Sequence, residues 1–408
     1  MQLTVFLNEI EVGMLERVAD GRTVLRFAES YLALRSRPVL GQYYVDKLRR
    51  APVPERSMPA YFANLLPEGE LRRLLASVVG AREHQDFALL ARLGEDLSGA
   101  VRVVAVGEIE DDPRPVSPPS SFANKLRFSL AGVQLKFSMR RSGKQLVLPV
   151  RGQHGDWILK LPDREFAELP ENEYAVMSWA RASGIDVPEF DVFTLAQVEG
   201  IDPRHFPEGT LAYGVRRFDR SPTGRIHVED FAQVNGIQPF NKYDDQPEPR
   251  AVGTRLNYET LARQILVFCG EPDLREFVRR LVFMVLSGNA DAHLKNWSLI
   301  YPDGRGARLS PAYDLVATVA YPGHGEDLAL PFHGAVALES VSLAGFRRMA
   351  RALGPDRDPE AMVAWVREDV ATIMGCREAS LGALSMEGQY ALAQMHTRLG
   401  STPDSLLR

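Results

Sequence analysis

The sequence contains only two cysteines, Cys269 and Cys376, in 408 residues. Two thiols so far apart provide neither a disulfide framework nor the paired spacing of a zinc site, so we expect free thiols in a reducing compartment. No apolar run approaches the roughly 18 residues of a membrane-spanning helix, and the first residues lack the basic region of a secretory signal. These absences predict a cytoplasmic protein that does not enter a membrane.

The chain also lacks an excess of positive charge, because 48 lysines and arginines stand against 53 acidic residues and give a net charge of −5. A dedicated nucleic-acid-binding protein is usually basic, so this class is disfavoured. A hydrophobic content of 45% and a charged content of 25% are typical of a globular protein. The length predicts two or three domains.

Proline and serine concentrate in one short stretch, EIEDDPRPVSPPSS at 108–121, which predicts a linker between domains. The preceding residues 1–107 mix strand and helix patterns, as expected of a small α+β domain. Residues 122–235 are rich in strand patterns, and residues 236–408 have mainly helical apolar spacing. The sequence therefore predicts an α+β protein with a strand-rich lobe and a helical lobe behind an additional N-terminal domain.

Three polar residues in the helical lobe have the order and spacing of a phosphoryl-transfer site. Asp291 and Asn296 lie in GNADAHLKN, and Asp314 follows in SPAYDLVAT after a short predicted hairpin. A kinase needs a carboxylate near the acceptor hydroxyl, and it needs oxygen ligands for the Mg²⁺ that bridges the nucleotide phosphates. The pattern of base Asp, metal Asn and metal Asp predicts this chemistry.

The alternative for each of these residues alone is a polar turn in which Asp or Asn caps a helix end. The three together favour the kinase interpretation. His293, inside the same motif, is more often a hydrogen-bonded residue that braces such a loop, so we assign it a supporting role at the nucleotide site. A metallohydrolase is disfavoured, because none of the eight histidines stands in an H-x-H or H-E-x-x-H arrangement.

A kinase also needs a cation that reaches the nucleotide phosphates. Lys160 lies in the apolar strand DWILKLP, where a lone lysine is costly without a partner. Glu173, in the first turn of the next predicted helix, is the natural ion-pair candidate. The alternatives are an edge-strand lysine that points to water and a glutamate favoured by the helix dipole.

Two further segments have weaker signals. In SLAGVQLKFSM, the backbone around Gly132 could cradle phosphates with Lys136 as a second cation, although a plain strand with one glycine would look the same. In RIHVEDFAQVNG, a strand turns into a polar segment between the lobes, so residues from Glu229 to Phe231 are candidates for the hinge that meets the nucleotide base. An ordinary strand-to-helix corner is the alternative.

These motifs together resemble the HipA family of bacterial serine/threonine kinases, which are toxins of toxin–antitoxin pairs. The resemblance spans nearly the whole chain in order: SLAGVQLK, WILKLP, ENEYAVMSWARASGIDVPE, VRRFDR, VEDFAQVNG with NKYD, GNADAHLKN and SPAYDLVAT. It implies a two-lobed protein-kinase-like fold with an added N-terminal domain, and it implies ATP and Mg²⁺ as cofactors.

The resemblance also implies roles for single residues. By position, Asp291 is the catalytic residue, and Asn296 and Asp314 bind Mg²⁺. The other implied nucleotide-binding positions are Ser129, Gly132, Val133, Gln134, Lys136, Lys160, Glu229 and Phe231. Ser129 falls at the family's autophosphorylation position, where a phosphate with about −1.5 to −2 charges would repel ATP and inactivate the enzyme.

The resemblance finally implies partners: a HipB-like helix-turn-helix antitoxin, operator DNA held through that antitoxin, and an aminoacyl-tRNA synthetase, such as glutamyl-tRNA synthetase, as the protein substrate. Phosphorylation of that substrate would arrest growth and favour persistence. Two alternatives stay open. One is a small-molecule phosphotransferase of the aminoglycoside type, and the other is a non-catalytic corepressor that binds the antitoxin.

Overall fold

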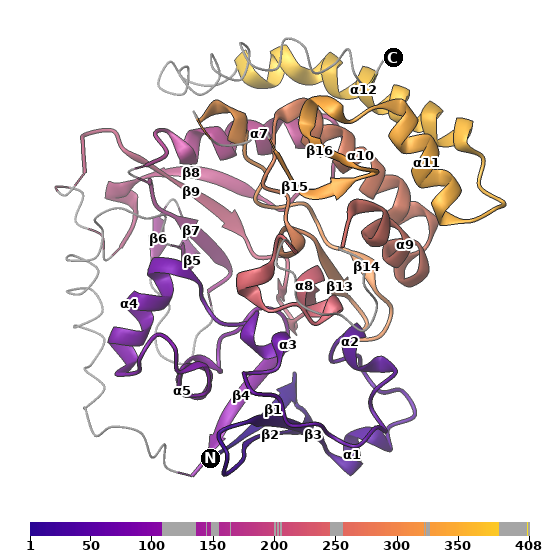
Figure 1. Cartoon of the computed structure of the whole chain (residues 1–408). Helices are drawn as coiled ribbons and strands as arrows, with labels where there is room; N and C mark the ends of the chain where they lie inside the picture. Colours follow the sequence, from indigo (N-terminus) through magenta and orange to yellow (C-terminus); the bar gives the residue numbers. More distant parts are fainter. Residues whose placement is uncertain are drawn as a thin grey trace.

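The computed structural model describes residues 1–107, 136–143, 145–147, 155–163, 165–199, 201, 204, 206–244, 256–321, 323, 327–382 and 406. The predicted linker at 108–121 and four predicted phosphate-loop residues, Ser129, Gly132, Val133 and Gln134, lie outside the described residues. Figure 1 shows the described parts as an N-terminal domain (indigo), a sheet lobe (magenta) and a helical lobe (orange to yellow).

The N-terminal domain is built on an antiparallel sheet of order β3-β2-β1-β4. Its strands are β1 (Gln2–Leu7), β2 (Ile10–Arg17), β3 (Thr23–Phe27) and β4 (Val101–Val106). Leu3, Val5 and Leu7 alternate along β1 and are all buried, as expected when one face of a sheet covers a core. The helices of this domain are α1 (Glu29–Leu32), α2 (Gln42–Val45), α3 (Ala60–Ala63), α4 (Gly69–Val79) and α5 (Asp86–Leu93).

The sheet lobe contains a five-stranded sheet of order β6-β5-β7-β9-β8, and its described pairings are antiparallel. Its strands are β5 (Lys136–Ser142), β6 (Gln145–Val147), β7 (Trp157–Lys160), β8 (Phe190–Thr194) and β9 (Leu211–Arg216). Helix α7 (Leu169–Ala182) carries the sequence NEYAVMSWARA. It packs toward the helical lobe, where Trp179 donates a hydrogen bond of 2.7 Å to the Ile373 carbonyl.

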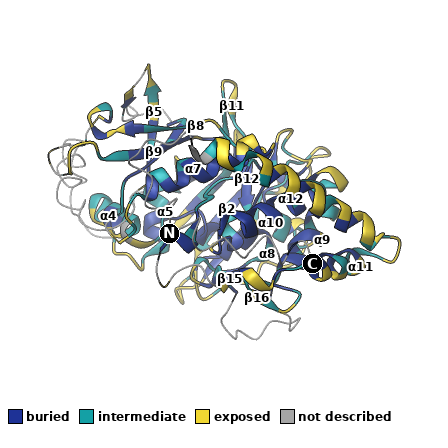
Figure 2. Cartoon of the chain, turned by 90° about the horizontal axis from the view of Figure 1, so that it is seen from above, coloured by how far each residue is buried: buried dark blue, intermediate teal, exposed yellow. Residues whose placement is uncertain are grey.

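The helical lobe is organised around α10, which is largely buried (Figure 2). Its helices are α8 (Phe231–Asn235), α9 (Tyr258–Cys269), α10 (Glu271–Ser287), α11 (Leu343–Leu353) and α12 (Pro359–Gly382). Phe277, Leu281 and Val285 repeat every fourth residue along α10 and are buried, which is the spacing of a core-facing helix stripe. In contrast, α12 presents exposed residues along its outer side (Figure 2).

Short strands complete the helical lobe and carry its loops. They are β10 (Arg220–Ser221), β11 (Gly224–Arg225), β12 (His227–Asp230), β13 (Ser298–Tyr301), β14 (Arg308–Leu309), β15 (Asp327–Phe332) and β16 (Ala335–Ala337). The three-stranded sheet β12-β13-β14 places the hairpin predicted between Asn296 and Asp314 beside the segment from Glu229 to Phe231. Loops that bear polar residues therefore meet where the two lobes join.

The N-terminal domain is packed against both lobes. Leu74 of α4 is buried in the core of the sheet lobe, in one cluster with Met139 and Trp157. Asp219, just after β9, is buried and accepts hydrogen bonds from Arg217, from Arg220 and from the backbone of Gly99. These contacts fix the N-terminal domain to the rest of the chain.

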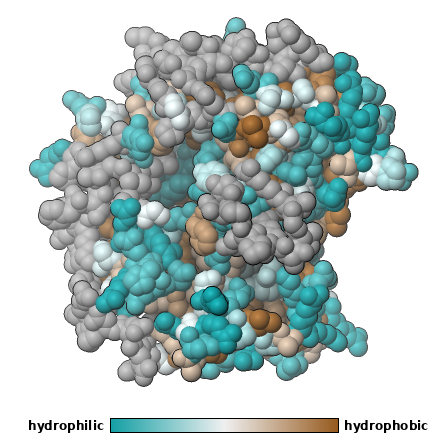
Figure 3. Space-filling model, in the orientation of Figure 1, coloured by the Kyte–Doolittle hydropathy of each residue, from teal (hydrophilic) through white to brown (hydrophobic). Residues whose placement is uncertain are grey.

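The face in Figure 3 is mostly hydrophilic in the residues that the structure describes, and its hydrophobic side chains form small separate patches. Among those residues, no helix has both the length and the apolar character needed to cross a bilayer.

Candidate active site

The loop that bears Asp291 begins where α10 ends. Gly288 adopts φ 71°, a left-handed conformation that glycine accepts without steric cost and that terminates the helix. The side-chain oxygen of Asn289 then accepts the backbone N–H of Asp291 at 3.2 Å. The Asn296 side chain donates to the Asp291 carbonyl at 2.9 Å. This bond uses the amide N–H₂ of Asn296, so its amide oxygen remains available to a ligand.

Asp314 lies beyond the β13–β14 hairpin in a strained conformation, with φ 55° at a residue other than glycine. Its carboxylate accepts a hydrogen bond from Lys160 and lies 3.3 Å from the Lys136 ammonium. Burial alone would raise the pKa of Asp314, but the two lysines hold it well below its usual range. The carboxylate is therefore ionised and poised to accept a cation.

Lys160 joins the two lobes at this point. Its ammonium lies 2.5 Å from Oε1 of Glu173, a buried residue on α7. Burial alone would lower the pKa of Lys160, but Asp314 and Glu173 raise it above its usual value. A buried lysine flanked by two carboxylates keeps its charge, and this charge is placed to meet an anion.

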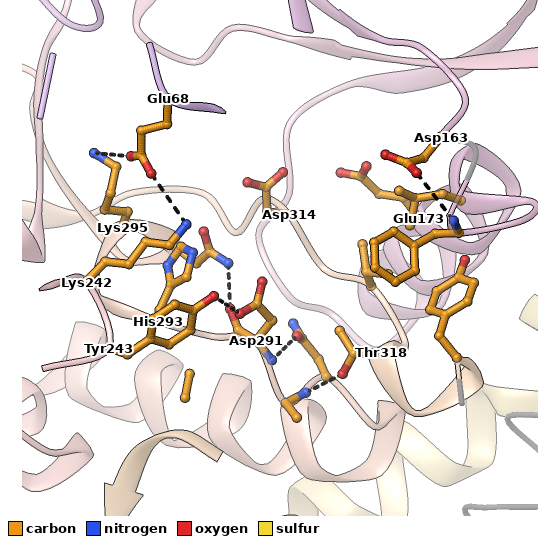
Figure 4. A pocket seen from close by; sticks show the side chains of 18 of the residues that line it. Glu68, Asp163, Glu173, Lys242, Tyr243, Asp291, His293, Lys295, Asp314 and Thr318 are labelled. Carbon is orange, nitrogen blue, oxygen red and sulfur yellow. Dashed lines mark hydrogen bonds and ion pairs between the residues drawn. The ribbon is translucent and has the colours of Figure 1, made fainter. Parts of the chain in front are cut away.

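These side chains border one pocket of about 920 Å³, a volume suited to a small-molecule ligand. Of the residues predicted from the sequence, the pocket brings together Lys136, Lys160, Glu173, Asp291, His293, Asn296 and Asp314. In Figure 4, Asp291 and Asp314 lie toward the middle of the pocket, with Glu173 on one side and Lys242, Lys295 and Glu68 on the other.

His293 is buried in the wall of this pocket, with its ring edge toward Tyr243. Burial lowers the pKa of His293 to about 3, and the nearby Lys242 ammonium acts in the same direction. The imidazole is therefore neutral at physiological pH. Its Nδ1 is buried and has no hydrogen-bond partner among the described residues.

Glu229 and Phe231 are placed differently from the other predicted residues. Both are buried, and neither belongs to the pocket lining. The Glu229 carboxylate faces the N-terminal domain, where it accepts the backbone N–H of Gln42 at 3.0 Å. It also accepts a hydrogen bond from the hydroxyl of Tyr301 on β13. The assignment of Glu229 and Phe231 to the hinge therefore stays a prediction.

The structure also adds site residues that the sequence did not single out. Tyr243 donates a hydrogen bond of 2.8 Å to Oδ1 of Asp291 (Figure 4). Glu68, just before α4, enters the pocket from the N-terminal domain and lies 3.5 Å from the Lys242 ammonium. Lys295 bonds to Asn64 of the N-terminal domain at 3.0 Å. NKYD was visible in the sequence, but nothing local links it to Asp291, 48 residues away.

The oxygen atoms of the pocket fit a magnesium ion shared with phosphates. Asp314 offers a carboxylate and Asn296 an amide oxygen, and both line the pocket. In the described part of the chain, no group of three or more His, Cys, Asp or Glu side chains could hold a metal by itself. Mg²⁺ usually binds one or two protein carboxylates together with water and substrate phosphates, so this donor set suits Mg²⁺ better than zinc.

Two family models match the chain. The HipA N-terminal domain model covers residues 3–104, and the HipA-like C-terminal domain model covers residues 128–374, more than half of the chain. The chain belongs to the HipA family. The resemblance stated from the motifs is thereby confirmed.

Two curated relatives of the chain are described as kinases. The chain is 42% identical over 334 residues to a Sinorhizobium fredii protein described as "Putative kinase Y4dM", with 78% of this chain and 77% of the relative covered. It is 26% identical over 301 residues to the Shewanella oneidensis serine/threonine-protein kinase toxin HipA, with 66% and 65% covered.

The fold matches a chain in the solved Shewanella oneidensis HipA, HipB and operator DNA complex. The TM-score is 0.75 at 20% identity, and 99% of this chain and 97% of the other are covered. This likeness confirms the predicted α+β, kinase-like fold of the HipA family.

Proposed function

We propose that this chain is an ATP-dependent serine/threonine protein kinase and the toxin of a HipBA-type pair. The observation that carries the proposal is the convergence of Lys160, Glu173 and Asp314 opposite Asp291 in one pocket. A cation paired with a helix carboxylate, a metal-binding Asp and a catalytic Asp are the parts that phosphoryl transfer requires.

Each residue has a distinct task in this proposal. Lys160, held by Glu173, binds the nucleotide phosphates, and Asp291 orients the acceptor hydroxyl and takes its proton. Asn296 and Asp314 would hold Mg²⁺, which when bound neutralises charge on the phosphates. Lys160 and Lys136, now paired with Asp314, would turn to the phosphates of ATP. The phosphate loop from Ser129 to Lys136, proposed from the family resemblance, would cover them.

Two substitutions of similar size separate these tasks. We predict that Asp291→Asn lowers the rate of phosphate transfer by at least about 10²-fold, because Asp291 acts on the acceptor. The affinity for ATP should stay near wild type. We predict that Asp314→Asn instead weakens Mg²⁺-ATP binding. Radiolabelled transfer to protein and calorimetric nucleotide binding distinguish the two effects. Near-wild-type turnover in Asp291→Asn would contradict the assignment of the base.

The toxin role rests on the family and on the HipB and operator DNA found with the Shewanella oneidensis neighbour. We propose a HipB-like antitoxin as partner, operator DNA bound through that antitoxin, and an aminoacyl-tRNA synthetase as substrate. Expression without a partner is expected to arrest bacterial growth, and Asp291→Asn is expected to relieve the arrest. Phosphoproteomics after brief expression identifies the substrate, and arrest that persists in Asp291→Asn would exclude phosphorylation as its cause.

We also propose that Ser129 is autophosphorylated and that its phosphate lowers ATP affinity by charge repulsion. Incubation with Mg²⁺-ATP followed by peptide mass spectrometry tests this proposal. One phosphate on Ser129 that is absent from Asp291→Asn supports the switch. An unmodified Ser129 in an active enzyme contradicts it.

A further inference from the structure

The stretch Ala317–Val319, just after Asp314, is bonded to two other parts of the active site. On one side it meets Asn172 of α7, which is almost fully buried. The Asn172 side chain donates to the Ala317 carbonyl at 3.1 Å and accepts the Ala317 N–H at 2.9 Å. A side-chain amide that satisfies both backbone groups of one residue fixes the position and the orientation of that residue.

On the other side, the stretch meets the loop that bears Asp291. The Thr318 hydroxyl accepts the Ala290 N–H at 2.9 Å and donates to the Gly288 carbonyl at 3.1 Å. The Val319 N–H donates to the same Gly288 carbonyl at 3.2 Å. Figure 4 shows Thr318 bonded to the loop beside Asp291. The Thr318 hydroxyl thus both donates to and accepts from the backbone that positions Asp291.

The neighbours of these residues in the sequence explain why the contacts matter. Asn172 directly precedes Glu173, so the turn of α7 that bonds to Ala317 also holds Lys160. Asp314 lies three residues before Ala317 with a positive φ of 55°, a conformation that persists only when its surroundings enforce it. The stretch is therefore connected to Lys160, to the metal-binding carboxylate and to Asp291 at once.

We propose that Ala317–Val319 is a junction that fixes the relative positions of Lys160, Asp314 and Asp291. Its positioning residues are Asn172 and Thr318. The proposal rests on the kinase function given above. Asn172 holds the Asp314 segment against α7 and so governs nucleotide and metal binding. Thr318 holds the Asp291 loop and so governs the transfer step. Neither residue needs to touch the reacting atoms for this effect.

The two residues are expected to produce different kinetic defects. Asn172→Ala leaves the Ala317 N–H without its partner, and the Ala317 carbonyl keeps only the Ala320 N–H. This frees the Asp314 segment from α7, so the Kd for Mg²⁺-ATP should rise roughly 10-fold, the scale of lost buried hydrogen bonds. Thr318→Val keeps the shape of the side chain but removes its hydroxyl, so kcat should fall roughly 10-fold. In this variant, KM for ATP should stay within about twofold of wild type. Thr318→Ser, which retains a hydroxyl, should recover most of the activity.

The experiment combines titration calorimetry with Mg²⁺-ATP, steady-state transfer kinetics and hydrogen exchange on the full chain. Exchange should accelerate around Asp314–Ala317 in Asn172→Ala and around Gly288–Asp291 in Thr318→Val. Ser183→Ala is the matched control, because Ser183 lies just after the same helix α7 and is also almost fully buried. The substitution removes a hydrogen bond of 2.8 Å from the Ser183 hydroxyl to the Trp179 carbonyl. It should leave Kd and kcat unchanged.

Two results would overturn the junction. One is wild-type Kd and kcat in both Asn172→Ala and Thr318→Val. The other is an identical loss in both variants that follows the melting temperature and is reproduced by Ser183→Ala. If the wild-type chain transfers no phosphate, the kinase function fails instead. Hydrogen exchange of the nucleotide-free chain then still decides on the junction, because the two local accelerations need no activity.

Discussion

The Tyr243 hydroxyl donates a hydrogen bond to the Asp291 carboxylate. One carboxylate oxygen is thereby held, and the other is left for an acceptor hydroxyl. We predict that Tyr243→Phe lowers kcat for phosphate transfer about 10-fold with little change in KM for ATP, because the base loses its orientation while the nucleotide side keeps its contacts. The assay is transfer to protein substrate over a range of ATP concentrations.

Tyr31→Phe provides the control for Tyr243→Phe. It removes a tyrosine hydroxyl that donates a 2.6 Å bond to the Pro38 carbonyl, far from the pocket lining. This variant should keep wild-type kinetics. Equal kcat in Tyr243→Phe and wild type would show that the Asp291 carboxylate needs no such support.

Glu229 gives the stability of the molecule a pH dependence. Burial raises its pKa from an ordinary 4.5 to about 8, so the folded chain binds a proton that the unfolded chain releases between these values. Stability should therefore fall as pH rises through this window. Burial lowers the pKa of the adjacent His227 from 6.5 to about 4, which makes its contribution rise with pH up to 6.5. Above pH 6.5 the His227 contribution is complete, while the Glu229 contribution continues to fall up to about pH 8.

We expect a loss of about 2 kcal/mol in unfolding free energy over that interval, since each pH unit corresponds to about 1.4 kcal/mol. Glu229→Gln, which cannot ionise, should abolish this slope. Urea unfolding of both proteins at several pH values measures the effect. A wild-type slope that Glu229→Gln leaves unchanged would assign the pH dependence to other groups.

The residues in the catalytic pocket differ in how far the sequence could predict them. Asp291, Asn296 and Asp314 stand in short motifs whose spacing predicts a role, and Lys160 in an apolar strand requires a partner such as Glu173. Those assignments remain predictions, but the structure places all five side chains around one pocket. Asn172, Thr318 and Tyr243 make their contacts with residues distant in the sequence, and such contacts leave no local pattern.

At the scale of elements, the segment after β9 carries a buried charge cluster at the contact with the N-terminal domain. Asp219 is buried, and although burial alone would raise its pKa, Arg217 and Arg220 hold this pKa below its usual value. Arg217 also donates to the Leu97 carbonyl of the N-terminal domain at 3.2 Å. The carboxylate therefore neutralises two arginines and receives the Gly99 N–H at the domain contact.

Asp219→Ala should lower the unfolding free energy by about 3 kcal/mol, because it removes the buried counter-charge of Arg217 and Arg220 and leaves them only Asp96. Denaturant unfolding measures the change. Asp20→Ala is the control, since it removes an aspartate from an exposed pair with Arg22 and should leave the unfolding midpoint nearly unchanged. Equal effects of the two substitutions would mean that the Asp219 cluster adds nothing to the domain contact.

The elements themselves were more predictable than their packing. Apolar and β-branched residues predict strands at LTVFL and TVLRF, which are part of β1 and form β3. Helical apolar spacing does the same for α9 and α10. The sequence predicts Glu173 in the first turn of its helix, but α7 begins at Leu169, with Pro170 in its first turn, so Glu173 lies beyond that turn. The burial of Leu74 in the sheet-lobe core was not predictable, because an apolar helix face does not state which sheet it will cover.

At the scale of the whole molecule, the N-terminal domain is joined to the rest by contacts at several separate places. Leu74 fills the sheet-lobe core, Gln42 bonds to Glu229, and Asn64 bonds to Lys295 beside the catalytic loop. Glu68 extends the same connection into the pocket. Buried contacts of this kind make independent unfolding of the N-terminal domain costly. We therefore expect the described parts to unfold as one cooperative unit.

This cooperativity predicts a long-range effect of ligand binding. Mg²⁺-ATP at a concentration 100 times its Kd should stabilise the folded state by about 2.7 kcal/mol. If the domains unfold together, amides in the N-terminal sheet, such as those of Leu3 and Val5, should gain the same protection from hydrogen exchange as amides in α10, although β1 does not touch the pocket. Exchange with mass spectrometry, with and without Mg²⁺-ATP, measures both regions in one sample. Asp314→Asn, with weakened nucleotide binding, should lose both gains. Protection confined to α10 would mean that the N-terminal domain opens by itself.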